Sequence, residues 1–203
     1  MTIGWITEAP IRKADSKEEA VLLLKQLKKN MKGWDKPSGI PERTSGSEWA
    51  TDQWAVWPRQ REKWIDRAQT SQGLVEDFID ELGDEDVWFY MVAGQPIGAM
   101  SLRSEEGFIH IEYLVTHPGS SDGGGALIQK AVQLSSKAGK GGKVRLCAGN
   151  ENAHDMYEHM GFVDIEDAGP DDMELNPATS GEWVPSNGSY RYKSYVGGSR
   201  WAA

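Results

Sequence analysis

The stretch EYLVTHPGSSDGGGA, residues 112–126, decides the fold. A β-rich run ends at His117-Pro118, and a short loop with three consecutive glycines follows it. Beyond the glycines, apolar residues recur at the spacing of one helical face: Leu127, Ile128, Ala131, Val132 and Leu134. The stretch therefore predicts a strand, a glycine-rich loop and a helix.

The glycine-rich loop predicts an anion site. Glycine lets the backbone approach a ligand closely, and the first N–H groups of a helix have no partner inside the helix. The positive end of the helix dipole adds to this attraction, most often for phosphate. The loop has neither the Gly-Lys-Ser/Thr of a P-loop nor G-x-G-x-x-G spacing. A flexible connection without a ligand is the alternative interpretation.

A second motif, NENAHDMYEHMGF, occupies residues 150–162 after a strand predicted over 143–148. It presents an Asn, then Ala153, then Tyr157 four residues later, then Gly161-Phe162. The two motifs in this order resemble those of the GNAT acetyltransferases. The resemblance covers residues 87–165 well and the N-terminal helices loosely. It implies an α/β fold of the α+β kind, with two N-terminal helices and a mixed, mostly antiparallel sheet whose fourth and fifth strands splay apart.

Helix signals precede the motifs. Ser16 and Glu19 form a capping box that predicts a helix over residues 16–32. A second amphipathic helix is expected over 58–82, and Gly73 is expected to split or bend it. Between them, residues 33–57 form a long loop rich in tryptophan, which is typical of a functional segment.

Three antiparallel strands in hairpin series are expected over residues 87–92, 96–102 and 108–116. Strict alternation in the last strand predicts one face with Ile109, Ile111, Tyr113 and Val115. The opposite face is then made of Phe108, His110, Glu112, Leu114 and Thr116. In the strand before the second motif, alternation suggests that Cys147, the single cysteine, is a small core residue.

The end of the chain leaves two alternatives. The closing strand of the sheet is either residues 190–196, which alternate, or residues 172–175. We expect a single domain overall, with residues 1–166 as the GNAT-like part and 167–203 as a C-terminal excursion that carries the closing strand.

Composition restricts the partners. The 203 residues carry a net charge of −9, which disfavours nucleic acid and favours cationic partners such as amines. No apolar run approaches a membrane span, and the N-terminus has no classical signal peptide, which predicts a cytoplasmic protein. Two possibilities are left open: that the protein is a secreted effector without a classical signal peptide, and that it forms a homodimer. Four scattered histidines and one cysteine predict no metal site.

The resemblance also implies a cofactor, acetyl-CoA, as co-substrate. Its pantetheine arm would pair with the backbone of Leu114, Val115 and Thr116, and Asn150 or Asn152 would hydrogen-bond the arm. Its pyrophosphate would lie on four amides, those of Gly123, Gly124, Gly125 and Ala126. The chain departs from the family's Arg/Gln-x-x-Gly-x-Gly/Ala loop, because Gly119 or Ser121 stands at the Arg/Gln position. Asp122 adds a negative charge, and both changes weaken binding of a diphosphate.

Acetyl transfer needs a base for the amine and an acid for the departing thiolate. The resemblance implies that Tyr157 is the acid that protonates the departing thiolate. Glu112 is the candidate base because it shares a strand face with apolar residues, and His110 is the second candidate, acting through water. In the tryptophan-rich loop, Trp34, Trp49 and Trp54 are expected to wall the acceptor pocket, or else to pack over the core.

These features predict an acetyl-CoA-dependent N-acetyltransferase acting on a primary amine of a small molecule or protein. Two alternatives stay open. One is a non-catalytic GNAT-fold module that senses CoA or binds a protein, favoured by the divergent loop. The other is an acetyltransferase that acts as a secreted effector or toxin.

Overall fold

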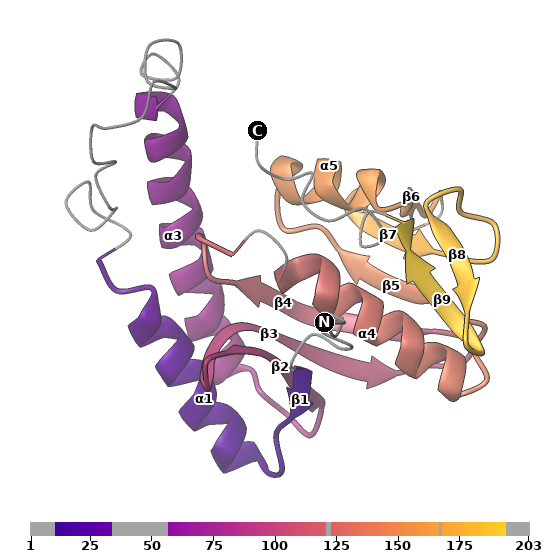
Figure 1. The fold of residues 1–203 in the computed structure, drawn as a ribbon, viewed down its shortest axis with the longest axis horizontal. Helices are drawn as coiled ribbons and strands as arrows, with labels where there is room; N and C mark the ends of the chain where they lie inside the picture. The colour runs from indigo at the N-terminus through magenta and orange to yellow at the C-terminus, as the bar shows by residue number, and fades with distance from the viewer. Residues whose placement is uncertain (1–10, 34–56, 121–122, 167, 194–203) are drawn as a thin grey trace, which may run out of the picture.

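The computed structural model describes residues 11–33, 57–120, 123–166 and 168–193, with the backbone alone for residues 57–64 (Figure 1). The three tryptophans proposed for the acceptor pocket, Trp34, Trp49 and Trp54, lie outside the described residues, as does Asp122.

The described N-terminal residues form the helices α1 (Lys17–Asn30) and α3 (Trp57–Asp80). Ser16 caps α1, since its Oγ accepts a hydrogen bond from the Glu19 N–H at 3.2 Å, and Glu19 Oε2 accepts one from the Asp15 N–H at 2.6 Å. The expected split at Gly73 is wrong, because α3 runs through this residue as one helix of 24 residues. A single glycine costs a helix only about 1 kcal/mol, which the apolar face of α3 can offset.

A seven-stranded sheet has the order β1-β2-β3-β4-β5-β7-β6. Its strands are β1 (Ile11–Lys13), β2 (Asp86–Val92), β3 (Gln95–Ser104), β4 (Ile109–Thr116), β5 (Val144–Cys147), β6 (Val163–Asp164) and β7 (Asp172–Leu175). Among the strand pairs of the described residues, only β4–β5 is parallel. Two further helices, α4 (Gly123–Lys137) and α5 (Glu151–His159), flank β5 in the chain. The predicted mixed, mostly antiparallel sheet is confirmed.

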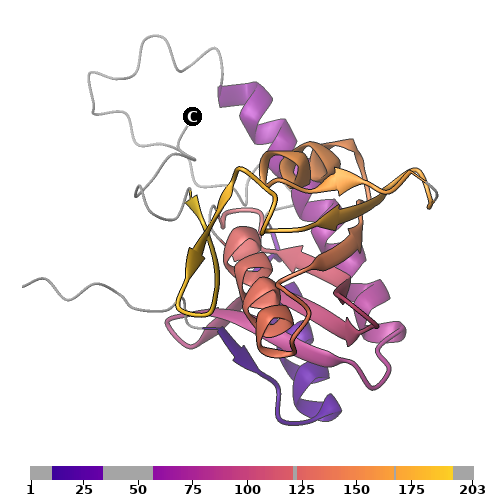
Figure 2. The ribbon, with the colours of Figure 1, turned by 90° about the vertical axis from the view of Figure 1, so that its right-hand side faces the viewer.

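Two hydrophobic cores lie on opposite sides of the sheet. Figure 2 shows α4 on one face and α1 with α3 on the other. The first core joins α4 to the sheet and includes Leu127, Ile128 and Leu146. The second joins α1 and α3 to the sheet and includes Leu24, Leu27 and Phe78.

A β-bulge at Glu112 makes β4 contribute to both cores. Leu102 pairs with Ile111 and Ser101 with Tyr113, so Glu112 has no counterpart in β3. Ile111 packs in the core under α4, whereas Tyr113 packs in the core under α1 and α3. The prediction that Ile109, Ile111, Tyr113 and Val115 share a face is therefore wrong. An extra residue in one strand reverses the sides of all residues beyond it.

The C-terminal part resolves the choice of closing strand in favour of residues 172–175. As β7, they pair with β5 on one side and with β6 on the other. The alternating residues further on form β9 (Ser189–Tyr192), which pairs with β8 (Trp183–Ser186) in a separate two-stranded sheet. None of the helices in the described part of the chain is long and apolar enough to cross a membrane.

Candidate active site

The parallel strands β4 and β5 part halfway along β4. They pair only through residues 109–111 of β4 and 144–146 of β5. Residues 112–116 of β4 continue to pair with β3, while β5 pairs on its other side with β7. Among the described residues, the backbone of this second half of β4 has no partner strand on the β5 side. The splay expected from the resemblance is confirmed.

The glycine-rich start of α4 follows directly after this free edge. Ser120 Oγ accepts a hydrogen bond from the Gly123 N–H at 3.1 Å, and a Cβ on Gly123 would lie 2.7 Å from that oxygen. The nearest group to a Cβ on Gly124 is Thr116 Cγ2, at 3.9 Å. Since the first amides of a helix have no helical partner, those of Gly124, Gly125 and Ala126 are backbone donors next to Thr116. This cradle fits a phosphate group, although Ser120 uses one of its amides.

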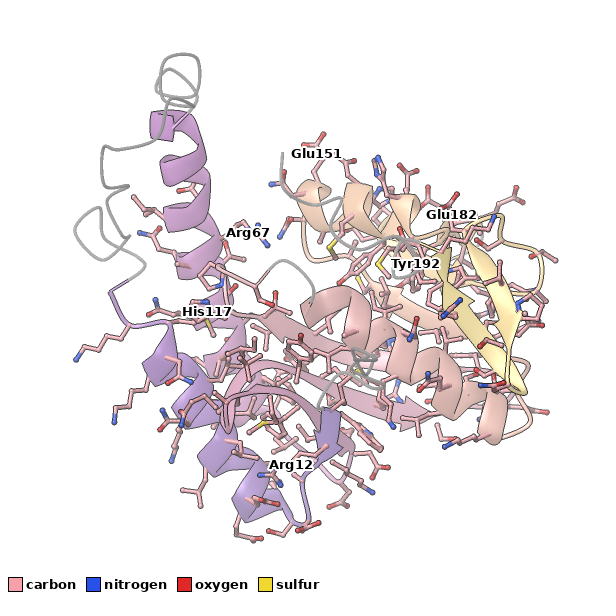
Figure 3. The ribbon with its side chains drawn as sticks, viewed as in Figure 1. Arg12, Arg67, His117, Glu151, Glu182 and Tyr192 are labelled. Atoms are coloured by element: carbon pink, nitrogen blue, oxygen red, sulfur yellow. The ribbon has the colours of Figure 1, made fainter. Side chains whose placement is uncertain are left out.

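His117 ties the loop before α4 to the end of α1 (Figure 3). Its Nε2 lies 3.2 Å from the Asn30 carbonyl oxygen, and its Nδ1 accepts a hydrogen bond from the Gly119 N–H at 3.1 Å. Burial lowers the pKa of His117, which favours the neutral ring that this pair of bonds requires. A cavity of about 290 Å³ lies beside it, lined by Asn30, Gln95, Ile97, His117, Gly119 and Ser120. No local sequence pattern predicts this tether, because it joins residues far apart in the chain.

Glu112, the predicted base, is paired with a cation. Arg103 Nη2 lies 2.8 Å from Glu112 Oε1, and Arg103 Nε lies 2.6 Å from Glu105 Oε1. The Glu112 contact is an ion pair without hydrogen-bond geometry, which leaves Oε1 buried and without a hydrogen-bond donor. His110 lies opposite Arg103 in the β3–β4 register. The purely apolar setting expected for Glu112 is wrong, because strand alternation did not show that Arg103 crosses to it from β3.

Tyr157, the predicted acid, lies on α5 with its side chain in the core under α4. It is 7% exposed, and its ring centroid lies 5.6 Å from that of Phe162. Burial, together with the neighbouring Cys147, raises the pKa of Tyr157 to about 12. Within the described part of the chain, no hydrogen bond engages its hydroxyl, and none joins it to Glu112 or His110.

Cys147 is exposed at the end of β5, where β4 and β5 have parted. The prediction of a core cysteine is wrong: Val144 and Leu146 take the inward positions of β5, so Cys147 points to the other face. Burial of the thiol and the carboxylates of Asp172 and Asp171 raise its pKa. The thiol therefore stays protonated near neutral pH.

The remaining predicted cofactor residues have other partners as well. Asn150 caps α5, since its Oδ1 accepts a hydrogen bond from the Ala153 N–H at 3.0 Å. No described residue accepts a hydrogen bond from its side-chain amide N–H groups, which can act as donors. Asn152 is exposed in the first turn of α5. In β4, Leu114 packs against the core under α4, whereas Val115 packs in the core under α1 and α3. The two side chains lie on opposite faces of the sheet, so the edge of this segment consists of backbone groups.

His154, Glu158 and Asp164 bring their ligand atoms within 4.8 Å of one another on the outer side of α5. His154 Nε2 lies 2.8 Å from Asp164 Oδ1, and this hydrogen bond raises the pKa of His154. The ion pair accounts for the cluster, in which Glu158 and Asp164 are exposed, whereas Tyr157 on the same helix is buried.

Residues 50–172 match the sequence model of a protein family, the acetyltransferase (GNAT) domain. The match spans more than half of the 203 residues. The chain therefore belongs to the GNAT acetyltransferases, a family of acyl-transfer enzymes. No curated protein sequence matches it significantly.

Three solved structures are among those similar to the chain. PaiA N-acetyltransferase from Thermoplasma acidophilum with coenzyme A is 22% identical, with a TM-score of 0.46, covering 82% of this chain and 97% of that one. A GCN5-related N-acetyltransferase from Rhodopseudomonas palustris is 17% identical, with a TM-score of 0.46 and coverages of 85% and 98%. The AtaT–AtaR complex bound to DNA is 19% identical, with a TM-score of 0.39 and coverages of 50% and 72%.

Proposed function

We propose that the chain transfers the acetyl group of acetyl-CoA to a primary amine of a small molecule or a protein. The observation that carries the proposal is the parting of β4 from β5 beside the glycine-rich start of α4. An unpaired strand edge offers alternating N–H and C=O groups, which the two amides of a pantetheine arm can match. The amides of Gly124, Gly125 and Ala126 would hold the diphosphate.

Acetyl-CoA supplies an activated acyl group as a thioester, and the chain supplies the proton transfers. Tyr157 is the proposed donor to the departing sulfur. With a pKa of about 12, its phenol is protonated at every working pH, so the donor is always ready. Because a thiol has a pKa of roughly 8.5, the raised value makes Tyr157 a hydrogen-bond donor to the thiolate more than a strong acid.

Glu112 is the proposed acceptor of the proton from the amine, with His110 as a relay through water. The bulge places Glu112 where β4 leaves β5, next to Arg103. A cationic amine that approached Glu112 would compete with Arg103 for the carboxylate, and the net charge of −9 favours such an acceptor. We propose no nucleic-acid or membrane partner.

Binding is tested first. Cys147 is the single cysteine and is exposed at the end of β5, so the rate of maleimide labelling reports on access to this position. We expect acetyl-CoA to slow labelling and to raise the melting temperature. Unchanged labelling and melting at millimolar acetyl-CoA would contradict the proposed cofactor site.

Turnover is tested by release of CoA thiol across a panel of primary amines. Tyr157→Phe should lower the rate about 10²-fold or more while acetyl-CoA still binds, because it removes only the donor. Tyr190→Phe is the matched control, since it removes a phenol from β9 outside the site. Equal turnover in Tyr157→Phe and wild type removes Tyr157 from the mechanism.

A non-catalytic CoA-binding module is the second candidate. It is favoured by the missing Arg/Gln of the pyrophosphate loop and by Ser120, which occupies the Gly123 amide. This function predicts binding of CoA and acetyl-CoA with no thiol release for any amine.

A further inference from the structure

The hairpin of β8 and β9 lies outside the matched family domain, which ends at residue 172. Asn187 and Gly188 form its turn with φ angles of 46° and 76°, as a tight hairpin turn requires. The hairpin forms its own two-stranded sheet. Since an isolated hairpin is marginally stable in water, contacts with the rest of the molecule must hold it in place.

Those contacts join the hairpin to the end of α5. Trp183 and Tyr192 face each other across the two strands, each 4% exposed, with ring centroids 5.4 Å apart. Trp183 Nε1–H donates to the Met160 carbonyl at 2.7 Å, and the Tyr192 hydroxyl donates to the His159 carbonyl at 3.1 Å. In Figure 3, Tyr192 lies near α5.

Other contacts join the hairpin to α4. The Tyr192 N–H donates to Gln129 Oε1 at 3.1 Å, and Ser189 Oγ donates to Ser136 Oγ at 3.0 Å. The hairpin therefore bridges α4, which begins at the proposed phosphate cradle, and α5, which carries Tyr157.

The hydrogen bonds from the hairpin to α5 are made to carbonyl groups at the C-terminal end of the helix. The last carbonyls of a helix have no helical partner, and a buried one is costly when it is left unsatisfied. Amides just beyond α5 satisfy the carbonyls of Tyr157 and Glu158, through Phe162 and Gly161. The next two carbonyls, at the helix end and cap, receive the donors from the hairpin.

We propose that Trp183 and Tyr192 are positioning residues that fix the end of α5 and, through it, the Tyr157 side chain. This inference rests on the proposed function. Tyr157 lies within one turn of the anchored carbonyls, and both its carbonyl and its ring contact Phe162 just beyond the helix end. A shift of this end therefore moves the Tyr157 hydroxyl relative to the sulfur that it serves.

Two variants remove one donor each and keep an aromatic ring, Trp183→Phe and Tyr192→Phe. We expect each to lower kcat by about three- to tenfold, the effect of one hydrogen bond, with KM for acetyl-CoA within about twofold of wild type. Trp88→Phe is the matched control, because the Trp88 Nε1–H is buried without a hydrogen-bond partner in the described structure. It should leave kcat unchanged.

A double-variant cycle separates positioning from general stability. In a Tyr157→Phe background, Trp183→Phe should cause no further loss of kcat, because the group it positions is already gone. Two losses that multiply would overturn the positioning role.

Hydrogen exchange tests the anchoring without any activity. Trp183→Phe should speed exchange of the Met160, Gly161 and Phe162 amides by about tenfold and leave the amides of α1 unchanged. Unchanged exchange at these three amides overturns the anchoring. A chain that releases no CoA with any amine overturns the proposed function, and the positioning role with it, while exchange still decides the anchoring.

Discussion

The two halves of β4 both carry buried apolar residues, but their surroundings differ. Residues 109–111 lie between β3 and β5 and send their apolar side chains toward α4. Beyond Glu112, the strand has β3 alone as its partner, and Tyr113 and Val115 turn toward α1 and α3. One extra residue thus separates a segment that holds the sheet together from a segment that leaves an edge open.

The largest expected effect comes from removing the bulge itself. Insertion of one alanine between Ser101 and Leu102 gives Glu112 a partner in β3 and restores strict alternation in β4, which turns Tyr113 and Val115 to the α4 side and reverses both cores at once. We expect loss of the cooperative urea unfolding transition. Glu112→Ala keeps the number of residues and loses only a partly exposed ion pair, so it should cost about 1 kcal/mol or less. An insertion variant with the wild-type midpoint would show that the bulge does not set the register.

Truncation of a side chain in the half of β4 that pairs with β5 should lower the free energy of unfolding more than truncation in the other half. Ile111 is 2% exposed in the core under α4, and Ile111→Ala should lower the free energy of unfolding by about 2–5 kcal/mol. Val115, also 2% exposed, loses fewer carbons on truncation to Ala and lies beyond the bulge. Urea titrations of both variants test the order, and a greater loss for Val115→Ala would contradict it.

Alkaline pH distinguishes the tyrosines of the two cores. The pKa of Tyr157 is raised to about 12 from an unfolded value near 10, so the folded state holds the proton more tightly. Its contribution is complete below pH 10 and is lost as the pH rises toward 12, by about 2 kcal/mol. Tyr157→Phe should therefore lose less stability than wild type between pH 9 and pH 12 in urea titrations.

Tyr113, whose pKa is also raised to about 12 by burial and by its bond to Glu81, is the matched comparison. It is only half-buried, so solvent screens the effect, and Tyr113→Phe should change the alkaline slope less. Equal slopes for the two variants would contradict the difference in burial.

The smallest change in stability is expected for a substitution in α3, the helix that packs on the second core with α1. A Cβ on Gly73 of α3 would have nothing within 4 Å, so Gly73→Ala should stabilise the chain by about 0.5–1 kcal/mol through the backbone alone. Gly161→Ala is the contrast, because its φ is +88° and its Cβ would meet the Ser180 side chain. Thermal unfolding should show opposite signs for the two substitutions.

The sequence predicted what local chemistry controls. The Ser16 cap, the hairpins of β2, β3 and β4, and the glycine-rich start of α4 all follow from residues close to one another in the chain. The parting of β4 and β5 came from the family resemblance and was confirmed.

What the sequence missed depends on partners far away in the chain. The sequence of β4 does not indicate whether the strand has a bulge, because the extra residue is defined only by the pairing of β4 with β3. The Arg103 contact to Glu112 and the His117 tether to α1 also cross between elements. The roles of Glu112, His110, Tyr157, Asn150 and Asn152 stay predictions.

Both borders of the seven-stranded sheet are short. At one side β1 has three residues, two of them the charged Arg12 and Lys13, and at the other β6 has two, including Asp164. Borders of this length and charge give an incoming strand too few backbone bonds to dock, which guards a concentrated solution against sheet-to-sheet aggregation. By contrast, the unpaired edge of β4, over residues 112–116, lies inside the sheet, next to β5 and away from both borders.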